Sequence, residues 1–150
     1  MMNPYSSKSV CSAYRQTPRS VPKTLAIAML YDEVIKLLGE GSHSFETGDF
    51  EAHYDIMQKA VKIIQALNAM LDFDQGKEVA VSLRRYYVSI SAQIIRATAR
   101  RDAPELCLQI QKQLAVMRDS WREISKQEND KAFQEGTVQS AGGPIRDARI

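Results

Sequence analysis

Cysteine is scarce in this sequence. Cys11 and Cys107 are the only two among 150 residues, and neither belongs to a CxxC pair or to a Cys/His cluster. Such sparse cysteine excludes a small domain that is held together by disulfides. It favours free thiols in a reducing compartment, with a single structural disulfide as the minor alternative.

Long hydrophobic runs are also missing. The longest, residues 25–31, is far shorter than the ~18 residues that a membrane-spanning helix needs. Residues 1–9 contain no apolar stretch of the kind that marks a secretory signal. We therefore expect a cytoplasmic protein without membrane insertion.

Neither sign of charge dominates the chain. It has 20 basic and 18 acidic residues, which give a net charge of +2. A nucleic-acid partner usually requires a basic stripe, so none is predicted. Hydrophobic residues make up 44% of the chain and charged residues 25%, proportions typical of one globular domain rather than of a disordered or collagen-like chain.

Motifs for catalysis, metals and cofactors are absent as well. The sequence has no Gly-x-Ser-x-Gly and no glycine-rich phosphate loop. Glu40 precedes His43 by three residues, but a di-iron bundle needs a second such pair, and the residue three before His53 is Phe50. We interpret both histidines as structural. No enzyme activity, no catalytic residue, no metal site and no cofactor is predicted.

Helical periodicity runs through the middle of the chain, and no strand pattern is found. Four helices are predicted: one that opens at residues 20–22 and loosens at Gly39 and Gly41, then residues 50–71, 77–101 and 104–131. Ser20 and Asp49 are the expected N-caps of the first two helices. Short connections force successive helices to be antiparallel neighbours. The predicted fold is all-α, an antiparallel up-down-up-down four-helix bundle over residues 21–132. A mobile N-terminal arm (residues 1–20) and a disordered C-terminal tail (residues 133–150) flank it.

The two middle helices have more apolar surface than a bundle core requires. On the 77–101 helix, one arc carries the core stripe, and a second arc lies roughly 160° away at ~100° per residue. The second arc consists of Val81, Val88, Ala92, Ile95 and Ala99. On the 50–71 helix, two adjacent stripes together cover about half of the helix. The surplus indicates a groove for a segment of another chain, a homodimer contact, or a helix that lies centrally and is buried on all sides.

Several short motifs occur in an order that resembles the FliS family of flagellar export chaperones. The resemblance covers residues 13–125. It is carried by Ala13-Tyr14-Arg15, Ser20-Val21-Pro22-Lys23-Thr24-Leu25, Met29-Leu30-Tyr31-Asp32, Lys59-Ala60, Ile63-Ile64, Leu67, Leu71-Asp72, Gly76-Lys77-Glu78-Val79-Ala80, Leu83, Tyr86-Tyr87, Met117-Arg118 and Trp121.

The resemblance implies a cytosolic chaperone that binds the C-terminal segment of flagellin, prevents premature polymerisation and delivers its client to the flagellar export gate. It also implies that the N-terminal segment around Tyr14 folds back near the client groove. The alternative is a helical-bundle adaptor or a weak homodimer that uses the same apolar stripe. The expected flagellin-binding residues are Ile56, Ile63, Leu67, Met70, Val81, Val88 and Ile95.

Overall fold

The computed structural model describes the backbone of residues 23–143 and the side chains of residues 23–135. This part of the chain forms four helices: α2 (Lys23–Glu46), α3 (Phe50–Ala69), α4 (Phe73–Ala97) and α5 (Ala103–Gly143). The predicted all-α class is confirmed. None of these helices is long and apolar enough to cross a membrane.

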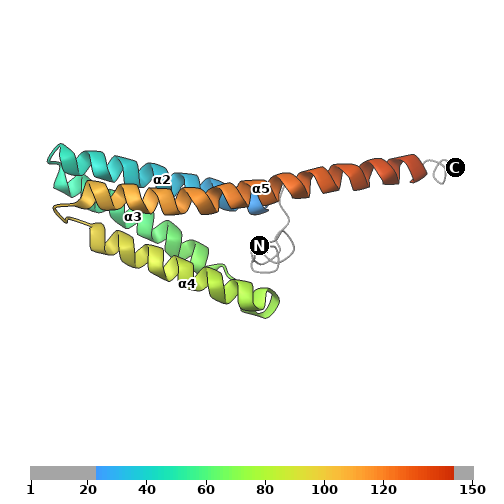
Figure 1. Ribbon diagram of the computed structural model, residues 1–150, viewed down its shortest axis with the longest axis horizontal. Coiled ribbons are helices and arrows are strands. Elements are labelled where there is room, and N and C mark those ends of the chain that lie inside the picture. The colour runs from blue at the N-terminus through green and yellow to red at the C-terminus, as the bar shows by residue number, and fades with distance from the viewer. Residues whose placement is uncertain (1–22, 144–150) are drawn as a thin grey trace.

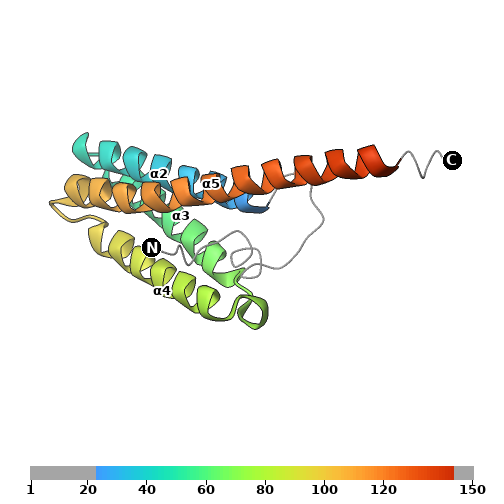
Figure 2. The same ribbon diagram turned by 45° about the vertical axis from the view of Figure 1, so that its right-hand side comes forward.

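The four helices lie at the corners of a square. α2 packs against α3 and α5, and α4 packs against the same two helices, whereas the diagonal pairs make no backbone contact within residues 23–143. Figure 1 shows each helix running opposite to the one before it. Both views show α4 diverging from α5 toward its own N-terminus (Figures 1 and 2). The pairing of α4 with α5 is the loosest of the four.

Aromatic residues from three helices meet in the core. Tyr31 on α2 lies with its ring centroid 6.3 Å from that of Tyr87 on α4 and 6.4 Å from that of Trp121 on α5. The hydroxyl of Tyr31 donates to that of Tyr87 at 3.0 Å. All three side chains are buried. These residues belong to the motifs that carry the family resemblance, so their position explains those motifs as core packing.

Aspartates begin the two middle helices. Asp49 accepts a hydrogen bond from the backbone N–H of Ala52 at 3.1 Å, and Asp72 accepts one from that of Gln75 at 3.1 Å. An aspartate at this position satisfies an N–H group that has no partner within the helix. The N-cap predicted at Asp49 is therefore confirmed. Ser20, the predicted N-cap of the first helix, lies outside the described residues.

Two glycines that were expected to loosen the end of the first helix lie inside α2. A Cβ on Gly39 would stand 3.2 Å from Nε2 of Gln111, which donates to the carbonyl of Ile35. A Cβ on Gly41 would stand 3.0 Å from Sδ of Met57. These glycines allow α5 and α3 to approach α2 closely, so the expectation of a loosened helix end was wrong.

α4 contains a break near its start. Lys77 has φ 47° and ψ −118°, which separates the first turn from the rest of the helix. The helix predicted to begin at Lys77 therefore begins with one additional turn, and it ends at Ala97 rather than at Arg101. Ala99, in the connection to α5, also has a positive φ of 63°. Non-glycine residues rarely adopt such angles, so both ends of α4 are strained.

His53 joins three elements at one end of the bundle. Its Nδ1–H donates to the carbonyl of Gly41 on α2 at 2.8 Å, and its Nε2 accepts from the N–H of Ala99 at 3.0 Å. The side chain is only 1% exposed. One imidazole therefore satisfies two backbone groups and fixes the connection between α4 and α5.

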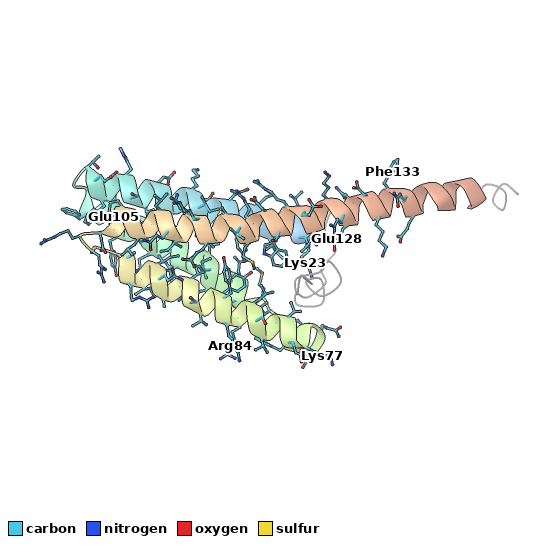
Figure 3. The ribbon with its side chains drawn as sticks, viewed as in Figure 1. Lys23, Lys77, Arg84, Glu105, Glu128 and Phe133 are labelled. Carbon is cyan, nitrogen blue, oxygen red and sulfur yellow. The ribbon has the colours of Figure 1, made fainter. Side chains whose placement is uncertain are left out.

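α5 continues past the predicted boundary near residue 132, to Gly143. Pro144 is the first proline beyond Pro104, and the intervening residues contain many helix formers. Figure 1 shows this last part of α5 extending away from the other helices. Phe133, labelled in Figure 3, lies on this extension. The predicted arm at residues 1–20 and the end of the tail lie outside the described residues.

Candidate functional site

The outer face of α4 carries a stripe of exposed apolar side chains. Val81, Val88 and Ile95 are 42%, 53% and 55% exposed. They are spaced by seven residues, so they lie nearly above one another along the helix. The opposite face of α4 is buried in the core through Leu83, Tyr87, Ile90 and Ile94. α4 therefore has the two apolar faces that the sequence predicts, and the second is open to solvent in the chain alone.

The apolar residues expected on α3 do not lie beside the α4 stripe. Ile56 contacts the α2 side of α3, because a Cβ on Gly41 would stand 3.4 Å from its Cγ2. Ile56 and Ile63 are partly buried and pack against the core. Met70, at the end of the helix, is 44% exposed. These three residues, again spaced by seven, form a second line along α3 that borders α2.

Leu67 is fully buried in the core. It can reach another chain only if the bundle opens, so we leave it out of the exposed surface. The α3 line and the α4 stripe do not form one continuous groove, because exposed polar side chains occupy the outward face of α3 between them. These are Asp55, Lys59 and Lys62. Tyr14, expected near the groove, lies outside the described residues.

The α4 stripe is flanked by two exposed arginines. Arg84 and Arg85 lie between Val81 and Val88 in sequence, and both are exposed. Figure 3 shows Arg84 pointing from α4 away from the other helices. Helical geometry places Arg84 on one side of the stripe and Arg85 on the other, at roughly 50° from it by ~100° per residue.

An ion-pair cluster joins α2 to α5 away from the stripe. Asp32 pairs with Arg118 at 3.0 Å and also with Arg122. The hydrogen bond with Asp32 is the main cause that raises the pKa of Arg118 above its usual value. This cluster includes the Asp and Arg of the family-like motifs and connects two helices, so its role is to fix their register.

Among the described residues outside the stripe, few side chains could act as a nucleophile or a metal ligand. Cys107 is fully buried, with its Sγ 4.0 Å from Sδ of Met57. Burial raises the pKa of this thiol to about 11. Among the described residues, no three His, Cys, Asp or Glu side chains gather into a group that could hold a metal ion.

The described part of the chain is an all-α bundle with an exposed apolar stripe on one of its helices, an arrangement typical of helical binding proteins. A family model for the flagellar protein FliS matches residues 3–128. The match spans most of the chain, and the chain therefore belongs to the FliS family. It ends at Glu128, which accepts a hydrogen bond from Thr24 near the start of α2, so the extension of α5 lies beyond the matched region.

Two relatives carry the name flagellar secretion chaperone FliS. The protein from Salmonella typhimurium is 30% identical over 100 residues, which cover 66% of this chain and 73% of the relative. The protein from Bacillus subtilis is 25% identical over 138 residues, which cover 92% of this chain and 98% of the relative. A chaperone is not an enzyme, so these names agree with the prediction that the chain has no catalytic role.

Proposed function

We propose that this protein is a cytoplasmic flagellar secretion chaperone that binds the C-terminal segment of flagellin along the outer face of α4. Membership of the FliS family supports the role of secretion chaperone. The observation that carries the binding site is the exposure of Val81, Val88 and Ile95 on a helix whose other face is already buried. An apolar segment of a client would cover these side chains and remove them from water.

Three of the other predicted residues on α3 fit this proposal as a secondary contact. Met70 is exposed at the end of α3, and Ile56 and Ile63 are partly exposed on the flank of α3 that borders α2. A client that uses both helices would pass around or across the polar outward face of α3. Binding in this way would keep an otherwise disordered segment unpolymerised until it is delivered to the export gate.

Titration of the purified chain with the C-terminal segment of flagellin tests the proposal. Saturable binding with one defined stoichiometry supports it. A chain that folds normally and shows no affinity for this segment would overturn it. Sedimentation of the chain alone adds the test of the alternative: a stable dimer that dissociates when Val88 is replaced by Asp would favour self-association through the same stripe.

A further inference from the structure

The charged side chains around the α4 stripe are mostly positive. Residues 79–101 contain five arginines and no aspartate, glutamate or lysine, although the whole chain has a net charge of only +2. The carboxylate of α4 that comes just before this stretch is the exposed Glu78, one heptad before Arg85. Arg84, Arg85 and Arg96 are exposed, and no carboxylate among residues 23–135 lies within ion-pair distance of them. The stripe is therefore a narrow line of apolar side chains with unneutralised positive charge on both sides. We call these three residues, Val81, Val88 and Ile95, the α4 seam.

We propose that the partner segment on this face is an amphipathic helix that carries carboxylates on both flanks of its apolar stripe. This inference rests on the proposed function and adds the chemistry by which the client is recognised. The apolar side chains would meet the seam of Val81, Val88 and Ile95. The flanking carboxylates would pair with Arg84 and Arg85, whose planar guanidinium groups bind carboxylates through two parallel hydrogen bonds.

The spacing of the seam fits one helix. Val81, Val88 and Ile95 recur every seven residues, and Ala92 follows Val88 by four. The contact positions of a two-helix coiled coil recur at the same intervals. In such a pair, charged residues beside the seam select the partner and its orientation. Arg84 occupies such a flanking position, whereas Arg85, four residues after Val81, lies one heptad before Ala92 at the edge of the contact.

The same charges argue against a second copy of this chain as the occupant. In a symmetric dimer through α4, each seam would face an identical one, so Arg84 and Arg85 of both copies would lie along one contact. Residues 79–101 supply no carboxylate to neutralise them. Like charges brought together at an interface oppose association.

A membrane surface is also a poorer fit than a helix. Helices that lie on membranes bury a broad apolar face that includes large side chains such as Trp, Phe and Leu. The broad apolar face of α4 is already buried in the core, and the exposed seam consists of two valines and one isoleucine. An acidic lipid surface therefore serves as a competing outcome in the test.

The test compares charge reversal with disruption of the seam in the full chain. The probe is the fluorescein-labelled C-terminal segment of flagellin from the same cell, titrated at about 0.05 M and about 0.5 M NaCl. The variant R84E/R85E should weaken binding about 10-fold at low salt and less than about 3-fold at high salt, since salt screens exposed charges. The matched control K112E/K126E changes the net charge equally on α5 and should alter binding by less than about 2-fold.

The outcomes separate this inference from the proposed function. If V88D abolishes binding while R84E/R85E and salt leave it unchanged, the charge inference is overturned and the proposed function stands. If V88D also binds as the wild type does, the seam is not the site and both fail. Co-sedimentation with phosphatidylglycerol vesicles that is lost in R84E/R85E, without any binding of the flagellin segment, would assign the arginines to a lipid surface and overturn the inference.

Discussion

Replacement of Val88 by Asp is the sharpest test of the α4 seam. About half of the Val88 side chain, 53%, is exposed in the chain alone. Full burial of a valine contributes about 1.5–3 kcal/mol, so covering the exposed half contributes about 1 kcal/mol. Val88→Ala should therefore weaken client binding about fivefold. An aspartate adds the cost of removing a carboxylate from water and should bring the loss to at least about 3 kcal/mol, or roughly 100-fold.

The substitution should leave the fold intact. Position 88 faces solvent, and surface changes of this kind usually alter stability by less than about 0.5 kcal/mol. Arg84 and Arg85 lie four and three residues before it, so a carboxylate there gains neighbours of opposite charge on the same helix. Circular dichroism and the midpoint of urea unfolding should thus match those of the wild type.

Val116 supplies the matched control. It is 68% exposed on α5, and Val116→Asp introduces the same charge at a site outside the seam. Fluorescence anisotropy with the labelled flagellin segment should show a large loss for Val88→Asp and almost none for Val116→Asp. If the two variants bind the flagellin segment with equal affinity, or if neither binds it, the assignment of the α4 seam as the binding site is refuted.

Three further predictions concern the bundle itself. His53→Ala should lower the free energy of unfolding in urea by about 2–4 kcal/mol, because a buried backbone carbonyl and a partly buried backbone N–H lose their partner, whereas the same change at the exposed His43 should cost less than about 0.5 kcal/mol. Lys77→Gly should raise the melting temperature by relieving a strain of about 1–3 kcal/mol at φ 47°, and Lys77→Ala, which keeps the Cβ, should give no gain. Cys107 has its pKa raised from 9.0 to about 11, so its contribution to stability is complete below pH 9 and is lost as the pH rises toward 11, by roughly 2–3 kcal/mol. Cys107→Ala should flatten that part of the stability curve, and an unchanged slope would contradict the assigned burial.

Much of the fold could be predicted from local pattern. Asp49 is an N-cap in both the sequence argument and the structure, because an aspartate before an apolar period satisfies a helix N–H whatever surrounds it. The seam on α4 could be predicted for a similar reason. Two apolar arcs on opposite sides of one helix cannot both face a single core, so one of them has to be exposed.

The rest depends on which helices are neighbours. The second stripe of α3 lies beside its core stripe, and periodicity alone does not say whether an adjacent helix covers it. In the structure α2 lies there, so Ile56 is partly buried, and Leu67 points fully into the core. Gly41 was misread for the same reason: a glycine that ends one helix and a glycine that admits a neighbouring side chain look alike in sequence.

Methyl-group NMR of the valines and isoleucines tests the central claim most directly. On addition of the C-terminal segment of flagellin, the methyl signals of Val81, Val88 and Ile95 should shift, because their exposed surface becomes covered. Those of Val116, the most exposed valine among the described residues, should stay in place. Shifts at Val116 with none at the three α4 positions would contradict the account.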